Sequence, residues 1–351
     1  MTTPEAIGLL KRLIATPSVT KNEEHTATLL FNEMESRGYD VQRYGNNLIA
    51  YNKYFSESKQ TVVLCSHHDT VYPNENYTLD PFTPTQKEGK LYGLGSNDAG
   101  GSLVSLFAAF DCLYPLENLR YNVALLFTAE EESSGVNGMS VMYSKVINPH
   151  LFVIGEPTSM DVAIAERGLM VLDCEVLGVS GHTAHNNTVN PIIKAMQDIA
   201  WFSEYKFDRV SDVLDEVKMS VTIINAGTAH NVVPGKCSFV VDVRNNGCYS
   251  NIEILEIIKQ NVECSVKARS VRLNASSIEV THPFVQCCID SGSVPFGSQT
   301  LSDQALVACQ SVKIGVGDTK RSHTSDEWIY ISEIESGIDK FIKIFKQYLE
   351  I

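Results

Sequence analysis

The sequence predicts an α/β fold with a central, mostly parallel sheet between helices, into which a ferredoxin-like α+β domain is inserted. Over residues 1–165, short apolar runs alternate with segments of helical periodicity. Over residues 166–278, the pattern changes to alternating strands with two helices, and the first pattern resumes over 279–351. We therefore expect one domain built from 1–165 and 279–351, and a second domain formed by 166–278.

The first part opens with helices, because apolar residues recur at helical spacing over residues 4–38 and the pattern stops at Gly38. Another helix is predicted at 102–114. Apolar runs that predict strands lie at 47–51, 61–65, 122–127 and 151–154. The last two runs are so apolar that we place them in the interior of the sheet.

The inserted part contains four predicted strands and two predicted helices. The strands are at 169–176, 218–225, 237–243 and 266–273, and the helices are at 190–202 and 251–262. Their order, strand-helix-strand-strand-helix-strand, is typical of a ferredoxin-like domain. The last part predicts a helix at 301–310, a strand at 312–315 and a helix at 331–349.

The composition is that of an ordinary globular protein, with 351 residues, 44% apolar and 20% charged. A formal net charge of −14, with no run of basic residues, argues against a nucleic-acid partner. No apolar stretch is long enough to cross a membrane. The nine cysteines are odd in number and lack C-x-x-C spacing, so we expect reduced thiols and a cytoplasmic protein.

Polar residues that directly follow the predicted strands are the first candidates for a functional site. His67 and Asp69 follow the run 61–65, at the sheet edge where α/β proteins bind ligands. Two residues apart on an extended chain, they point to one side, so that Asp69 can orient the His67 imidazole. The alternative is a pair of solvated residues at a strand end.

A glycine-flanked aspartate comes next, Asp98 in the run Gly-Leu-Gly-Ser-Asn-Asp-Ala-Gly-Gly at 93–101. The glycines permit close approach of the backbone. The run lacks the Gly-Lys-Ser/Thr ending of a phosphate loop and the glycine spacing of a dinucleotide site. A helix cap is the alternative role for Asp98.

Further carboxylates follow the two interior strands. Glu130, Glu131 and Glu132 come after 122–127, and Glu156 comes after 151–154. Consecutive carboxylates repel one another, so a positive charge is expected among them, although charge runs are usually solvated. Together with His323, in a loop before the last helix, these residues form a nitrogen and oxygen ligand set suited to two divalent ions bridged by a carboxylate.

With these five motifs in order, the sequence resembles the di-zinc amidohydrolases, a family that includes acetylornithine deacetylase, succinyl-diaminopimelate desuccinylase, aminoacylase and carboxypeptidase G. The match spans nearly the whole chain. It implies that the split domain, 1–165 with 279–351, is a zinc-peptidase-like catalytic domain. It also implies that the insert, 166–278, is a dimerisation or lid domain, which makes the protein a homodimer.

The resemblance also implies the role of each site residue and a cofactor of two zinc ions, for which cobalt or manganese could substitute. His67 and Glu156 would hold one ion, Glu132 and His323 the other, and Asp98 both. Asp69 would orient His67, and Glu131 would be the general base.

In the insert, the resemblance points to residues that would act on the substrate. His182 would reach the tetrahedral intermediate across a dimer interface, with His185 as a rival. Arg244 and Asn231 would hold the substrate carboxylate, with help from Arg167. The competing roles are turn residues for the histidines and Asn231, and a strand-end ion pair for Arg244.

The implied activity is hydrolysis of the amide bond of an N-acyl amino acid. N-Acetylornithine or N-acetylcitrulline deacetylation in arginine biosynthesis is the first expectation, and succinyl-diaminopimelate desuccinylase or a metal-dependent dipeptidase is the alternative. The sequence departs from the family at residues 98–101, where this chain has Asp-Ala-Gly-Gly and many relatives have Asp-Met-Lys-Gly-Gly, so that a lysine common in the family is missing. Two alternatives come from a different class, a non-catalytic metal-binding protein and a metal-free glycoside hydrolase. Structural zinc sites are usually closed and cysteine-rich, which argues against the first, and bound zinc would argue against the second.

Overall fold

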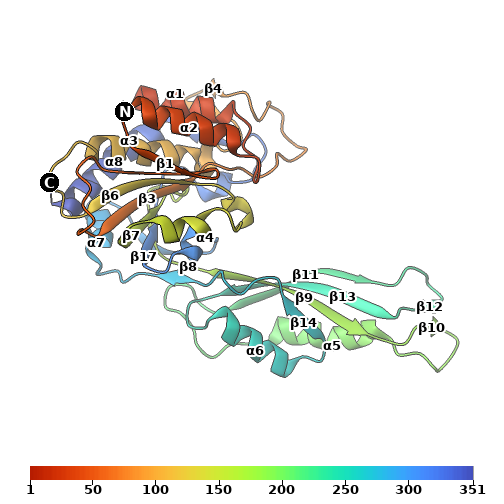
Figure 1. The fold of residues 1–351 in the computed structure, drawn as a ribbon. Coiled ribbons are helices and arrows are strands. Elements are labelled where there is room, and N and C mark those ends of the chain that lie inside the picture. Colours follow the sequence, from red (N-terminus) through yellow and green to blue (C-terminus); the bar gives the residue numbers. More distant parts are fainter. Residues whose placement is uncertain (351) are drawn as a thin grey trace. The chain divides into compact units, whose positions relative to one another are not determined.

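The computed structural model describes residues 1–350, and the chain divides into two compact units (Figure 1). The larger unit comprises Met1–Ile164, Ser277–Phe296 and the residues from Ser302 onward, and the smaller unit comprises Ala165–Ser276 and Gly297–Leu301. The sequence analysis placed Gly297–Leu301 in the larger part. It belongs to the smaller unit because the Ser298 carbonyl accepts the Arg167 N–H at 3.1 Å and the Gln299 side chain binds the Arg167 guanidinium.

The larger unit is built on a mixed sheet in the order β1-β2-β6-β3-β7-β17-β8-β15, with β16 paired to β8. The four central strands, β6, β3, β7 and β17, are parallel, as the sequence predicts, and antiparallel pairs flank them. The strands are β1 (Val41–Tyr44), β2 (Asn47–Tyr51), β3 (Thr61–His67), β6 (Asn122–Thr128), β7 (Pro149–Ile154), β8 (Val162–Glu166), β15 (Ser276–Ser277), β16 (Pro295–Ser298) and β17 (Gln310–Lys313).

Helices cover both faces of this sheet, with α1, α3 and α8 on one face and α4 on the other (Figure 1). Alternate residues of a strand point to opposite faces. Val62 and Leu64 of β3 therefore pack in the core beneath α3, while Val63 and Cys65 pack with α4. The helices are α1 (Thr3–Ile14), α2 (Glu24–Ser36), α3 (Gly101–Leu113), α4 (Met139–Met142), α7 (Pro283–Asp290) and α8 (Ile331–Leu349).

Short elements connect this framework. A three-stranded sheet pairs β18 (Trp328–Tyr330), β5 (Lys90–Tyr92) and β4 (Thr85–Lys87). The short helical turns are η1 (Ser96–Gly100), η2 (Glu131–Ser133), η3 (Tyr143–Lys145), η4 (Asp303–Leu306) and η5 (Thr319–Arg321). The predicted helix at 301–310 is wrong, because only η4 forms there; Ser302 caps it, and the buried Gln304 side chain donates to the Ser311 carbonyl.

The smaller unit has an antiparallel sheet in the order β11-β13-β9-β14, and α5 and α6 cover one of its faces (Figure 1). The element order is the ferredoxin-like one expected. The elements are β9 (Gly168–Leu177), α5 (Pro191–Glu204), β11 (Lys218–Ala226), β13 (Lys236–Asn245), α6 (Asn251–Asn261) and β14 (Ser265–Ala268), with a β10 (Gly181–His182) and β12 (Val232–Val233) pair.

The last strand of this unit is shorter than the predicted 266–273. β14 ends at Ala268, and beyond it the Asn251 side-chain amide donates to the carbonyls of Val271 and Leu273. The Leu273 carbonyl also accepts the Leu169 N–H at 2.9 Å, so a backbone bond and a side chain together hold the segment beyond β14. Among residues 1–350, none of the helices has the length and apolar content needed to cross a membrane.

Candidate metal centre

The carboxyl ends of three neighbouring strands bring the predicted ligands together. β3 lies between β6 and β7, with His67 opposite Thr128 and Cys65 opposite Ile154. His67 is the last residue of β3, Glu131 and Glu132 follow β6 in η2, and Glu156 follows β7. Parallel strands bind ligands at this edge because their polar ends converge there.

The imidazole of His67 is held in one orientation. Its Nδ1 atom donates to the backbone carbonyl of Asp69 at 2.9 Å, since a carbonyl oxygen only accepts. Nε2 then faces the carboxylates of Asp98, at 3.2 Å, and Glu156, at 3.6 Å. Burial alone lowers the pKa of His67, but hydrogen bonds to Asp69 and Asp98 and the nearby glutamates raise it well above its usual value.

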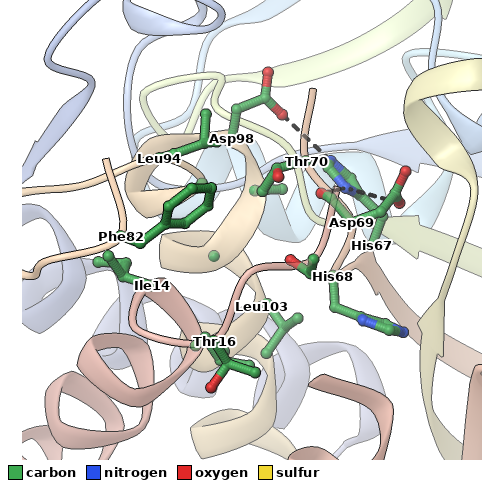
Figure 2. Close-up of a pocket in the computed structure, with 15 residues that line it drawn as sticks. Ile14, Thr16, His67, His68, Asp69, Thr70, Phe82, Leu94, Asp98 and Leu103 are labelled. Carbon is green, nitrogen blue, oxygen red and sulfur yellow. Dashed lines mark hydrogen bonds and ion pairs between the residues drawn. The ribbon is translucent and has the colours of Figure 1, made fainter. Parts of the chain in front are cut away.

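The carboxylate of Asp98 lies between two imidazoles (Figure 2 shows its contact with His67). One oxygen is 3.2 Å from Nε2 of His67, and the other is 3.5 Å from Nε2 of His323. His323 Nε2 is also 3.0 Å from Glu132 Oε2, and that hydrogen bond raises the pKa of His323 to about 9. A carboxylate with one oxygen toward each imidazole has the arrangement of a bridging ligand.

The remaining carboxylates crowd the same space. Burial and neighbouring negative charges raise the pKa of Glu156 to about 8, and the same causes raise the pKa of Glu131 well above its usual value and that of Glu132 to a smaller extent. Ligand atoms of His67, Glu131 and Glu156 lie within 4.8 Å of one another, as do those of His67, Asp98 and Glu132. Imidazole and carboxylate donors at this spacing fit divalent ions such as zinc, which would also relieve the repulsion.

Asp69 does more than orient a histidine. Its buried carboxylate accepts the backbone N–H of Glu131 at 3.0 Å and of Glu132 at 3.2 Å, together with the Thr20 hydroxyl. One side chain therefore fixes both the end of β3 and the turn that carries the glutamate pair. The sequence pattern predicted only the contact with His67.

Two neighbouring polar residues turn away from the centre. His68 is bound through Nδ1 to the Thr26 hydroxyl at 2.9 Å and through Nε2 to the Asn46 carbonyl at 2.8 Å, and burial lowers its pKa. The Glu130 carboxylate accepts the side chain and backbone N–H of Asn137. The side chains of both residues are therefore occupied by contacts outside the candidate metal centre.

A cavity of about 20 Å³ lies beside His67 and Asp98, lined by both polar and apolar side chains, among them Ile14, Phe82 and Leu103 (Figure 2). A volume of this size holds about one water molecule.

Sequence reasoning missed two buried carboxylates next to the centre. Glu327 accepts backbone N–H groups of Gly95, Asn97 and Asp98. Asp303 accepts the hydroxyl of Thr128 at 2.7 Å, and its charge contributes to the raised pKa of Glu131. Glu327 follows His323 in the same loop, which is the only sequence signal that pointed to it.

In the smaller unit, His182 and Asn231 lie close together at the β10–β12 pair. The Asn231 carbonyl accepts the Thr183 N–H, and the His182 ring is 5.7 Å from that of His185. Arg244 forms a two-point contact with Asp242, at 2.8 and 3.1 Å.

Arg167 is buried within the smaller unit. Its side chain is 1% exposed, and its guanidinium donates to Gln299 Oε1 at 2.6 Å and to the carbonyls of Glu216 and Leu214. These contacts hold the guanidinium within this unit, and its role in substrate binding stays a prediction.

Comparison with known proteins agrees with this geometry. The chain is 28% identical to acetylornithine deacetylase of Proteus mirabilis, over 95% of this chain and 94% of the relative. It is 29% identical to succinyl-diaminopimelate desuccinylase of Bordetella petrii, over 75% and 72%.

Solved structures share the fold. A tripeptidase from Staphylococcus aureus superposes with a TM-score of 0.81 at 19% identity, covering 100% of both chains. A dinuclear metal binding peptidase from Bacillus subtilis gives 0.73 at 14% identity, over 99% and 98%. The model of Peptidase family M20/M25/M40 matches residues 63–347. The resemblance drawn from the five motifs is therefore confirmed: the chain is a hydrolytic enzyme that acts on amides and belongs to peptidase family M20/M25/M40.

Proposed function

We propose that this chain is a two-zinc hydrolase that removes the acyl group from an N-acyl amino acid. The observation that carries the proposal is the Asp98 carboxylate, which presents one oxygen to His67 and the other to His323. In this proposal His67 and Glu156 hold one ion, Glu132 and His323 hold the other, and Asp98 holds both. When bound, the two ions supply Lewis acidity that polarises the acyl carbonyl and lowers the pKa of a water between them.

The protein's own groups then move the proton. Glu131 lies beside these ligands, with its carboxylate close to His67 and Glu156. A carboxylate in this place can accept a proton from the attacking water and give it to the leaving amine nitrogen afterwards. Asp69 keeps this base in place through the backbone N–H groups of residues 131 and 132.

Residues of the smaller unit complete the proposal. Arg244 and Asn231 would hold the α-carboxylate of the substrate, and His182 of a second copy would stabilise the oxyanion, with His185 as the rival. Asp242 binds Arg244 through Nε and Nη2, and the guanidinium carries further N–H donors that could bind the substrate carboxylate. A homodimer through the smaller unit follows from a histidine that acts on the neighbouring chain.

Substrates with an acetyl group are the first choice. A relative aligned over 95% of the chain is named acetylornithine deacetylase, which supports N-acetylornithine as the substrate. N-Acetylcitrulline and a place in arginine biosynthesis belong to the same proposal. The succinyl-diaminopimelate desuccinylase relative is about as identical over a shorter span, so a succinylated amino acid is the second candidate. All nine cysteines are unpaired, which fits a reducing compartment, and we propose the cytoplasm.

The test is amine release by the zinc-loaded protein from N-acetylornithine, N-acetylcitrulline, N-succinyl-ornithine, N-succinyl-diaminopimelate and simple dipeptides. We expect hydrolysis of one acylated amino acid, lost on chelation and restored by zinc. Preferred cleavage of dipeptides would overturn the substrate class. No hydrolysis by protein that holds two ions per chain would favour a non-catalytic metal-binding protein.

The dimer is tested by complementation. A chain with His182→Ala mixed with a chain carrying Glu131→Gln should regain activity, because one of the two sites then has both groups intact. Heterodimers that form without activity would remove the role of His182 across the interface.

A further inference from the structure

We propose that Glu327 is a positioning residue that sets the place of Asp98 relative to His323. The inference rests on the part of the proposed function that makes these two residues metal ligands, and it concerns how the chain holds them before an ion arrives. Its evidence is a set of hydrogen bonds between two loops that are more than 200 residues apart in the sequence.

The Glu327 carboxylate is buried against the loop that carries Asp98. The side chain is 1% exposed, and Oε1 accepts the N–H groups of Asn97 at 2.7 Å and Asp98 at 2.9 Å. Oε2 accepts the N–H of Gly95 at 3.2 Å. Three backbone donors that converge on one carboxylate form an anion-binding nest, here filled by the protein itself.

This loop has no regular helix to hold it. Gly95 has φ of +76° and Asp98 has φ of −117° and ψ of 96°, so the N–H groups of the turn are not directed along a helix axis. Without the carboxylate, these buried donors would lose their acceptor. Glu327 therefore defines the backbone from which the Asp98 side chain extends.

A second contact ties the same two loops together. The Asn97 side chain accepts the Asp318 N–H at 3.0 Å and donates to the Asp318 carbonyl at 3.1 Å. Asp318 precedes His323 by five residues, and Glu327 follows it by four. The segment that carries His323 is thus attached to the Asp98 loop on both sides of the histidine.

The consequence concerns the ligand spacing. Because each oxygen of Asp98 faces a different imidazole, a rotation of its backbone moves both contacts at once. Groups that hold metal ligands in place typically change metal affinity by about 10–100-fold when removed. Glu327 is expected to act in this range although it touches no ion.

The chain offers a matched control one residue away. The Asp326 carboxylate also accepts backbone N–H groups, those of Thr78 at 2.8 Å and Leu79 at 2.9 Å, but this loop carries no proposed ligand. Glu327→Gln and Asp326→Asn both replace an acceptor-only carboxylate by an amide. Only Glu327→Gln changes a side chain that binds the backbone of Asp98.

The experiment titrates metal-free full-length protein with zinc by calorimetry and with cobalt by visible absorption. For Glu327→Gln we expect zinc affinity to fall about 10–100-fold and the cobalt spectrum to change, while Asp326→Asn matches the wild type in both. Glu327→Asp keeps the negative charge on a shorter side chain and should give an intermediate zinc affinity. It replaces Glu327→Gln in the titration if that variant does not fold.

Equal zinc affinity in the wild type and both Glu327 variants would overturn the proposal, as would an equal loss in Asp326→Asn. If the wild type binds no zinc, the ligand assignment and the positioning role both fail. If the wild type binds two ions and hydrolyses no amide, the proposed function fails while the positioning role is decided by the titration.

Discussion

The substitution Glu131→Gln separates the roles of base and ligand, because it keeps the shape of the side chain and removes its charge and its ability to accept a proton. Ligand atoms of Glu131 and Glu156 lie within 4.8 Å. Two unit charges at that distance repel by about 3–4 kcal/mol at an effective dielectric constant of 20 and by about 1 kcal/mol in water. Burial of the charge, together with repulsion by Glu156, Glu132 and Asp303, outweighs the attraction to His67, because the pKa of Glu131 is raised well above its usual value.

We therefore expect the metal-free Glu131→Gln protein to be more stable than the wild type, by about 1–3 kcal/mol. We expect two zinc ions per chain to remain, because the five other residues hold them. Turnover should fall about 100–10,000-fold, which is the range for loss of a general acid–base group. The assays are urea unfolding in the presence of chelator, metal content by mass spectrometry and amine release.

The outcome that refutes this reasoning is the loss of one zinc ion per chain. It would show that Glu131 is itself a ligand, as its closeness to His67 and Glu156 permits. A metal-free variant that is less stable than the wild type would refute the electrostatic part, and turnover within tenfold of the wild type would remove Glu131 as the base.

Three further predictions concern stability. In Asp69→Asn, the amide can accept only one of the N–H groups of Glu131 and Glu132, so the free energy of urea unfolding should fall by about 1–3 kcal/mol. An unchanged free energy would mean that water replaces the lost hydrogen bond. Burial lowers the pKa of His150 and His282 below the usual 6.5, so the unfolded chain takes up protons first and stability falls as the pH drops below about 6.5. His150→Gln should flatten that decline in the melting temperature, and an unchanged slope would contradict it. A Cβ at Gly100 would lie 2.4 Å from a backbone carbonyl oxygen, so Gly100→Ala should lower the free energy of unfolding by about 1–3 kcal/mol. Gly8 lies in open space on the exposed face of α1, so Gly8→Ala should raise it by about 0.5–1 kcal/mol. Equal effects of the two substitutions would show that the loop around Gly100 adapts to the added methyl group.

The places of His67, Glu131 and Glu156 were predictable from the sequence, because each residue follows an apolar run that is typical of a strand in the interior of a sheet. The runs before His67, Glu131 and Glu156 became β3, β6 and β7, which are neighbours in the sheet. Because these strands are parallel, their carboxyl ends lie at one edge of the sheet, and the functional site is expected at that edge.

The supporting contacts were not predictable in the same way. Glu327 and Asn97 act on backbone groups far away in the sequence, and no local pattern distinguishes such a carboxylate from a solvated one. A local motif also could not predict that the Arg167 guanidinium contacts Gln299 and the Glu216 carbonyl, which are distant in the sequence. The helix predicted at 301–310 is wrong because only the short turn Asp303–Leu306 forms there, where the buried Gln304 side chain donates to the Ser311 carbonyl.

Gly100 stands where a side chain has no room. A Cβ at this position would meet the Gly95 carbonyl and the Leu10 side chain. The path of residues 95–100 therefore excludes a side chain at Gly100. The same path directs the N–H groups of the loop to Glu327.

The anomalous scattering of zinc in a crystal of the zinc-loaded protein tests the two-zinc site directly. We expect two peaks about 3.5–4 Å apart, with one oxygen of Asp98 bound to each. His67 and Glu156 should contact one peak and Glu132 and His323 the other, with Glu131 bound to neither. A single peak, or two peaks that do not share Asp98, would contradict the two-zinc site on which the proposed hydrolysis depends.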